Sequence, residues 1–191
     1  MTKHDSHAEA LQRDFPAAPL VPALDFARRG IPSHGHSAVD FEQRVNFDRL
    51  REYRISRAVE SLEASGCGAF LLFDFYNIRY TTQTWIGGAL GDKMSRYALL
   101  TRDRKPYLWD FGSAAKHHKL FAPWLEPERS MAGMLGLRGA IHPDVGLMRD
   151  AVTTIKGILT DAGVAEEPIG IDIVEPEFLF EMQRQGLKVV D

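Results

Sequence analysis

The sequence predicts an α/β fold in which a mixed sheet of about five to six strands is flanked by helices. Two observations carry this prediction. Short apolar runs of strand length alternate with longer segments whose apolar residues recur at helical spacing. In addition, two of the apolar runs are separated only by the charged turn at residues 102–105, which indicates an antiparallel hairpin within the alternating pattern.

The first predicted elements are a helix at residues 46–66 and a buried strand at residues 68–74. Asn46 can cap the start of the helix, and Gly66 can end it. Six apolar residues lie near one face of this helix: Phe47, Leu50, Ile55, Ala58, Val59 and Leu62. Interleaved arginines and acidic residues on the other face indicate a solvated, salt-bridged surface. The continuous apolar run GAFLLFD is typical of a central strand buried on both faces.

The remaining elements continue the alternation of strands and helices. The hairpin occupies residues 95–111, and a short helix at 113–125 is stopped by Pro123, with an extended segment at 128–134 after it. Residues 143–163 have the most regular helical pattern. The last elements are a strand at 168–174, a short helix at 175–186 and a strand at 187–191.

Residues 1–40 contain several prolines and four of the seven histidines, without a sustained helical or strand period. We predict that they form an extended N-terminal arm and that residues 41–191 form the folded domain. The chain also ends inside a predicted strand, which favours a segment of a longer protein.

Composition argues against several classes of function. The net charge of -3 gives no general attraction to nucleic acid or to an anionic membrane. No apolar stretch approaches the roughly 20 residues that span a bilayer. The N-terminus lacks the apolar segment of a secretory signal, and the single cysteine, Cys67, cannot form an internal disulfide, so we expect a cytoplasmic location. We interpret Cys67 as a small buried thiol rather than a nucleophile.

The sequence contains few signs of catalytic chemistry. The glycine-rich nucleotide-binding motifs, the HExxH metal motif, the GxSxG nucleophile motif and the CxxC motif are all missing from the chain. Four carboxylates lie near predicted strand ends: Asp74, Asp110, Asp172 and Glu175. A pair of carboxylates can in principle transfer protons or bind a metal, but at strand ends they are more often helix caps and turn formers. The residues therefore predict no catalytic site and no metal site.

The segment DFYNIRYTT, which follows the predicted buried strand, resembles the N-terminal domain of the creatinase, prolidase and aminopeptidase P family. The match comprises residues 77–81 and then residues 97–100 of the hairpin, and the order of elements agrees over residues 44–191. The resemblance implies a creatinase N-terminal domain-like fold with a ribonuclease H-like layer arrangement.

The same resemblance implies that this segment is the non-catalytic N-terminal domain of a metal-dependent hydrolase. The catalytic domain, with divalent ions such as Mn, Co, Zn or Fe, is then expected outside this chain. The expected partners are that C-terminal catalytic domain, a second subunit in a homodimer, and a small-molecule or dipeptide substrate, with no nucleic acid and no membrane. Two alternatives stay open: the N-terminal domain of a dimethylsulfoniopropionate lyase-like enzyme, and a free-standing binding module. The codons after Asp191 would separate the module from the enzymes.

The matched residues mostly predict architecture. Asn77 can stabilise a turn through the neighbouring backbone, Tyr80 can pack beneath the sheet, and Arg79 can bond carbonyl groups or pair with a carboxylate. The loop at residues 83–96 is long enough to be functional. Within it, Trp85 is the candidate for contact with substrate or partner, and Arg96 for holding an anionic group. The alternative for Trp85 is that it folds back on the domain.

Overall fold

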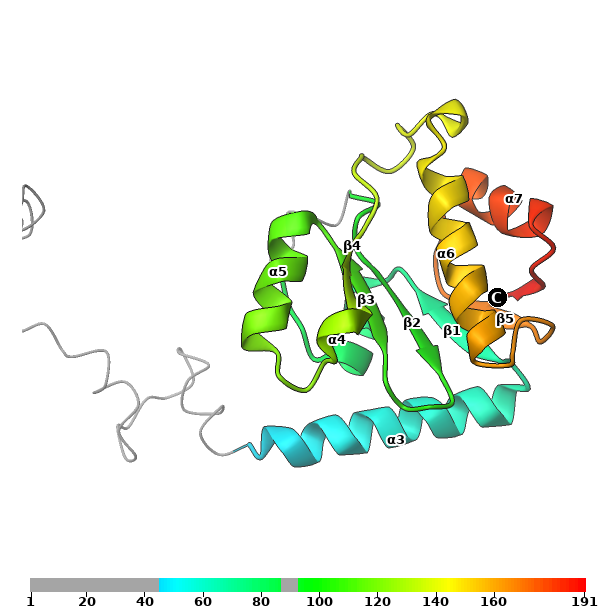
Figure 1. Ribbon diagram of the computed structural model, residues 1–191. Helices are drawn as coiled ribbons and strands as arrows, with labels where there is room; N and C mark the ends of the chain where they lie inside the picture. Colours follow the sequence, from blue (N-terminus) through cyan, green and yellow to red (C-terminus); the bar gives the residue numbers. More distant parts are fainter. Residues whose placement is uncertain (1–44, 87–92) are drawn as a thin grey trace, which may run out of the picture. The chain divides into compact units, whose positions relative to one another are not determined.

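A six-stranded mixed sheet organises the part of the chain that the computed structural model describes, residues 45–86 and 93–191 (Figure 1). The strands are β1 (Ala69–Leu72), β2 (Tyr97–Thr101), β3 (Tyr107–Asp110), β4 (Ser130–Ala132), β5 (Ile169–Ile171) and β6 (Val189–Val190). The α-helices in these residues are α3 (Phe47–Ser65), α4 (Phe75–Thr82), α5 (Gly112–Phe121), α6 (Leu147–Asp161) and α7 (Pro176–Arg184). Two short 3-10 helices, η2 (Pro127–Arg129) and η3 (Pro143–Val145), complete the described elements.

The strand order is β4-β3-β2-β1-β5-β6. β2 is antiparallel to both of its neighbours, β1 and β3, whereas β1 with β5, β5 with β6 and β3 with β4 are parallel pairs. The sheet therefore contains the predicted hairpin, β2–β3, within otherwise parallel strands. The predicted fold class, a mixed sheet of about five to six strands flanked by helices, is confirmed.

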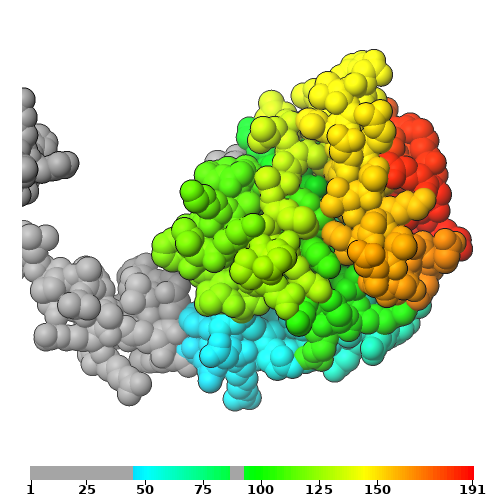
Figure 2. Space-filling view, in the orientation of Figure 1, coloured from blue at the N-terminus to red at the C-terminus, as the bar shows by residue number. Residues whose placement is uncertain are grey.

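The two faces of the sheet carry separate hydrophobic cores, because successive strand residues point to opposite sides. On β1, Leu71 belongs to the larger core, which includes buried residues of α6 and α7, such as Ile155 and Phe178. Leu72, the next residue, belongs to a smaller core with Ile78 of α4. Figure 1 shows α6 and α7 on one side of the strands and α4 and α5 on the other. The space-filling view shows α6, in yellow and orange, packed beside α7, in red (Figure 2).

Several predicted boundaries differ from the structure. The regular helix expected at residues 143–163 is divided, because Gly146 has a φ of 81° and separates η3 from α6. Val145, an apolar residue of that expected helix, lies in η3 and is 63% exposed. α5 ends at Phe121, before Pro123, rather than at residue 125. Of the six apolar residues expected on one face of α3, only Val59 and Leu62 are buried.

Residues 48–191 cluster into one compact unit. The predicted arm, residues 1–40, lies outside the described residues, so its boundary stays a prediction. Cys67 is 4% exposed, in agreement with its interpretation as a buried thiol. Among the described helices, none has the combination of length and hydrophobicity that crossing a membrane requires.

Candidate functional site

The sheet topology brings Arg96 and three of the strand-end carboxylates to one edge. β1, β3 and β5 run in the same direction, so their carboxyl ends lie together, and β2 begins at this edge. Asp74 and Asp172 follow β1 and β5, Asp110 ends β3, and Arg96 immediately precedes β2. Ligand sites of open α/β sheets commonly lie outside the carboxyl ends of the strands. This edge is therefore the candidate site.

The segment from Phe75 to Thr82 forms the helix α4, and the turn predicted there is wrong. Asp74 caps the helix, because its carboxylate accepts hydrogen bonds from the backbone N–H groups of Tyr76 (2.9 Å) and Asn77 (3.0 Å). Gln83 ends the helix with a φ of 51°. The eight-residue length conceals the helical period, but an aspartate directly after a buried strand was a signal for a helix cap.

Asn77 helps to bind the Asp172 carboxylate instead of stabilising a local turn. Asp172 Oδ2 accepts hydrogen bonds from Asn77 Nδ2 (3.1 Å) and from the backbone N–H of Asp74 (3.0 Å). Its Oδ1 accepts from the backbone N–H groups of Phe73 (2.8 Å) and Ile173 (2.6 Å). All four donors are neutral. Asp172 thereby joins the end of β5 to the junction between β1 and α4.

Tyr80 and Arg79 differ from their predicted roles. Tyr80 is 36% exposed rather than packed beneath the sheet, and the guanidinium carbon of Arg54 lies 5.4 Å from the centre of its ring. The buried residue of this helical turn is Ile78, with 0% exposure. The guanidinium carbon of Arg79 lies 4.9 Å from the centre of the Trp85 ring, a cation–π contact. Arg79 thus supports an aromatic residue.

Trp85 folds back on α4 and still leaves 46% of its surface exposed. Its ring contacts Phe75 edge to face, with centroids 6.1 Å apart, and lies 6.2 Å from the ring of Tyr76. Tyr76 and Ile173 beside it are 71% and 51% exposed. We call Tyr76, Trp85 and Ile173 the Trp85 surface. It offers ring faces and an aliphatic side chain, which suit contact with another molecule.

A shallow hollow of about 300 Å³ lies at the Trp85 surface. Besides the three residues of this surface, it is lined by Phe73, Asp74, Phe75 and Arg138. Arg138 also forms an ion pair with Glu175, with 3.5 Å between Nη1 and Oε1. The hollow therefore has an apolar wall, and its charged side chains are already engaged in contacts within the domain.

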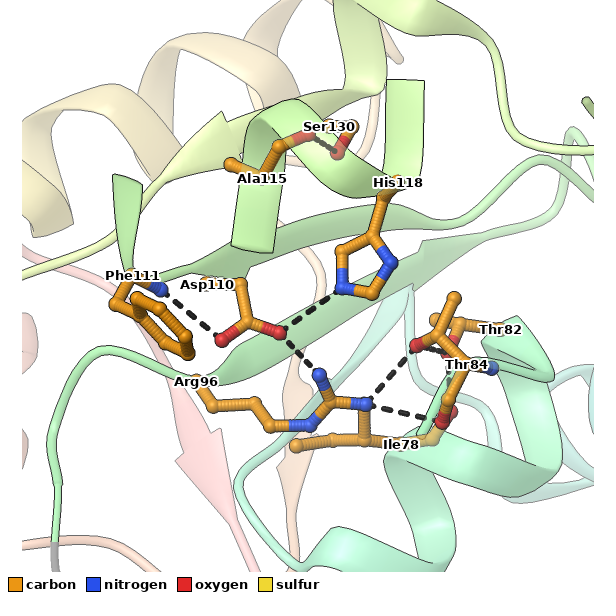
Figure 3. Close-up of polar contacts among 9 residues, drawn as sticks. All are labelled: Ile78, Thr82, Thr84, Arg96, Asp110, Phe111, Ala115, His118 and Ser130. Carbon is orange, nitrogen blue, oxygen red and sulfur yellow. Dashed lines mark hydrogen bonds and ion pairs between the residues drawn. The ribbon is translucent and has the colours of Figure 1, made fainter. Parts of the chain in front are cut away.

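Arg96 lies in a buried network rather than on the surface (Figure 3). Its Nη1 forms an ion pair with Asp110 Oδ2, and its Nη2 donates to the backbone oxygen (3.0 Å) and hydroxyl (2.9 Å) of Thr84. The same Asp110 oxygen lies 3.1 Å from His118 Nε2. Burial lowers the pKa of Arg96 from its ordinary value, while the charge of Asp110 and its hydrogen bond oppose this shift. The anionic group that Arg96 contacts is thus an internal carboxylate.

The network closes the base of the loop at residues 83–96, because Arg96 at one end is hydrogen-bonded to Thr84 at the other. Residues 87–92 of this loop lie outside the described residues. The sequence did not reveal that His118 and Thr84 contact this network, since neither residue belongs to a recognisable motif. The predicted hairpin at 95–111 already places Arg96 and Asp110 near each other, whereas the separation of 8 residues between Asp110 and His118 carries no local signal.

The described residues do not fit a metal ion. Within residues 45–86 and 93–191, no group of three or more His, Cys, Asp or Glu side chains is placed to hold one. The carboxylates of the site are instead bound by backbone N–H groups, by Asn77 or by arginines.

Comparison with known proteins gives fold likeness at low sequence identity. No protein-family model matches the chain, and no curated protein matches it. Among solved structures, it is similar to an Xaa-Pro aminopeptidase from Streptococcus pyogenes, with 16% identity, a TM-score of 0.49 and coverage of 75% of this chain and 92% of that one. It is also similar to the N-terminal domain of the cytoplasmic peptidase PepQ from Mycobacterium tuberculosis, with 21% identity, a TM-score of 0.48 and coverage of 72% and 91%.

A third likeness, to an Xaa-Pro dipeptidase from Bacillus anthracis, has 10% identity and a TM-score of 0.49. It covers 73% of this chain but only 33% of the dipeptidase, so this chain spans about a third of that protein. The structures that the chain is similar to thus include N-terminal, creatinase/prolidase-like domains. At these identities the likeness concerns the arrangement of elements and not an activity.

Proposed function

We propose that this chain is the non-catalytic N-terminal domain of a cytoplasmic, metal-dependent hydrolase of the creatinase or Xaa-Pro peptidase kind. In this proposal it supports a homodimer, and its Trp85 surface borders the active site of the partner subunit. The metal ions, Mn, Co, Zn or Fe, and the catalytic groups belong to a C-terminal domain outside this chain. The substrate is a dipeptide or another small molecule.

The observation that carries the proposal is the position of Trp85. Its side chain is 46% exposed at the carboxyl edge of the sheet, and two supports hold the segment that precedes it. Asp172 fixes the start of α4, and Arg96 fixes Thr84. An exposed aromatic residue on a fixed backbone is suited to recognition, because little conformational entropy is lost on contact. The resemblance of residues 77–81 and 97–100 to the family supplies the kind of partner.

The carboxylates at this edge support a structural role for the chain. Asp74 caps α4, Asp110 pairs with Arg96, Asp172 accepts four hydrogen bonds and Glu175 pairs with Arg138. A general acid or base needs to reach the proton that it transfers. Because these groups are engaged within the fold, we assign catalysis to the other domain.

The first test uses the 191-residue chain alone. We expect it to hydrolyse no Xaa-Pro dipeptide in the presence of Mn, Co or Zn, and its melting temperature to stay unchanged on addition of each ion. A well-ordered metal site would raise the melting temperature, since the ion would bind the folded state preferentially. A clear rise with one stoichiometric ion, or turnover of a dipeptide, contradicts the assignment of catalysis to another domain.

The second test uses the protein encoded by the reading frame extended past Asp191. We expect Trp85→Ala to lower kcat/KM for a dipeptide substrate by about tenfold or more, which corresponds to about 1.4 kcal/mol. Tyr53→Ala is the matched control, because Tyr53 is a 56% exposed aromatic residue on α3 that contacts Arg57. Equal effects of the two substitutions would overturn the proposed role of the Trp85 surface. A stop codon directly after Asp191 would overturn the whole proposal and favour a free-standing module.

A further inference from the structure

His118 lies at one end of a buried series of polar contacts that leads to Thr84 (Figure 3). Its Nε2 is 3.1 Å from Asp110 Oδ2, the oxygen that also accepts a hydrogen bond from Arg96. Arg96 Nη2 in turn donates to the backbone oxygen of Thr84 at 3.0 Å and to its hydroxyl at 2.9 Å. Thr84 directly precedes Trp85 in the sequence. The contacts therefore connect α5 to the residue before Trp85.

The orientation of the Arg96 guanidinium is determined by the contacts that its two terminal nitrogens make. Its Nε is buried and has no hydrogen-bond partner among the described residues, so Nη1 and Nη2 make the contacts that orient the group. The guanidinium carbon also lies 5.4 Å from the centre of the Phe75 ring, and Phe75 contacts Trp85 with centroids 6.1 Å apart. A displacement of Arg96 thus reaches Trp85 by two routes, through Thr84 and through Phe75.

His118 helps to fix the Asp110 carboxylate to which Arg96 is bound. Asp110 Oδ1 accepts a hydrogen bond from the backbone N–H of Phe111 at 3.0 Å, and Oδ2 faces both Arg96 and His118. Because a carboxylate oxygen is an acceptor, the His118 contact requires a proton on Nε2. Asp110 is 0% exposed, so water does not readily replace a donor lost there. Without the His118 donor, the carboxylate and Arg96 would have to reorient together.

We propose that His118 is a positioning residue for Trp85. By fixing the Asp110 carboxylate, it determines where Arg96 holds Thr84 and Phe75, and so how Trp85 is presented at the surface. The biological role of this positioning rests on the proposed function of the Trp85 surface. The positioning itself is measured on Trp85 directly and does not require the catalytic domain.

The experiment measures the indole N–H resonance of Trp85 in ¹⁵N-labelled 191-residue chain, assigned with Trp85→Phe. His118→Leu removes the N–H donor and is expected to shift or broaden this resonance. His118→Gln keeps a side-chain N–H donor of similar reach and is expected to return the resonance towards its wild-type position. His117→Leu is the matched control, since the exposed His117 contacts the rings of His118 (6.1 Å between centroids) and Phe121 (4.6 Å), so this variant separates the loss of a neighbouring ring from the loss of the contact between His118 and Asp110.

An unchanged Trp85 resonance in folded His118→Leu overturns the proposal, and so does a failure of His118→Gln to differ from His118→Leu. If His118→Leu does not fold, His118→Asn takes its place, because its shorter side chain is polar but stops short of Asp110. Loss of folding in both variants also overturns the proposal, since the contact would then support the whole domain. If Trp85→Ala leaves turnover unchanged while His118→Leu still shifts the resonance, only the proposed function fails.

Discussion

Asp110 and Asp172 lie at the same edge of the sheet, yet their carboxylates are satisfied by different partners. Asp110 is fully buried and pairs with the cation of Arg96, with His118 and the backbone N–H of Phe111 as further partners. Asp172 is only partly buried and accepts four hydrogen bonds from neutral N–H donors. A fully buried charge needs an opposite charge, whereas a partly hydrated carboxylate is stable with N–H donors alone.

The two carboxylates also support Trp85 through different contacts, one beneath its ring and one at the backbone that precedes it. Asp172 holds the junction between β1 and α4, the helix on which the Trp85 ring rests. Asp110 acts through Arg96 on Thr84, at the opposite end of α4. The comparison predicts that removing either carboxylate destabilises the domain. The decrease in stability should be larger for Asp110, whose charge is fully buried.

The largest effect is expected for Asp110→Ala, which leaves the Arg96 charge buried without its partner. We expect the free energy of unfolding to fall by about 3 to 5 kcal/mol, measured by urea denaturation with circular dichroism. Asp144→Ala is the control, because the side chain of Asp144 is 91% exposed, and its effect should stay within about 0.5 kcal/mol. A loss below about 1 kcal/mol for Asp110→Ala would show that the buried charge of Arg96 does not need Asp110 as its partner.

Asp172→Ala is expected to be milder, with a loss of about 1 to 3 kcal/mol in the same urea denaturation. It removes the acceptor of four hydrogen bonds, but the site is partly exposed, so water can reach some of the freed N–H groups. If this loss equals or exceeds that of Asp110→Ala, the difference in burial does not determine how much each carboxylate contributes to the free energy of unfolding.

Trp85→Ala tests whether the residue that follows the two supported points belongs to the core. We expect a loss within about 1 kcal/mol, because a half-exposed side chain leaves little cavity when it is removed. Trp109→Ala is the matched comparison, since Trp109 is 3% exposed and stacks on Tyr97 with centroids 4.8 Å apart. That substitution should cost about 3 to 5 kcal/mol. Similar losses for the two tryptophans would remove Trp85 from the proposed recognition surface.

The smallest effect is expected for Asn77→Ala. The change removes one of the donors to Asp172, but Asn77 is exposed and alanine favours the helix by roughly 0.6 kcal/mol over asparagine, so the net change should lie within about 0.5 kcal/mol. A double-mutant cycle with Asp172→Ala isolates the contact and should give a coupling of about 0.5 to 1.5 kcal/mol. A coupling of zero would show that the three backbone N–H groups alone determine the stability of the Asp172 site.

The sequence by itself determined the layered α/β fold. The apolar run of β1, the hairpin of β2 and β3 and the helical period of α6 are local patterns, and a local pattern states which face of an element is buried. The helix α4 was missed because only eight residues form it and three of them, Ile78, Thr81 and Thr82, are β-branched. Its cap, Asp74, was visible in the sequence as a carboxylate at a strand end.

The partners of the polar residues were decided only by the tertiary structure. Asn77 and Asp172 are 95 residues apart, and they meet because β5 lies beside β1 in the sheet. Arg96 was singled out from the sequence as a binder of anions, and the antiparallel pairing of β2 with β3, which sets Tyr97 opposite Trp109, places Asp110 against it, inside the domain. A hydrogen bond acts over about 3 Å, so the pairing and register of the strands, and not residue type alone, select the partners of Arg96 and Asp172.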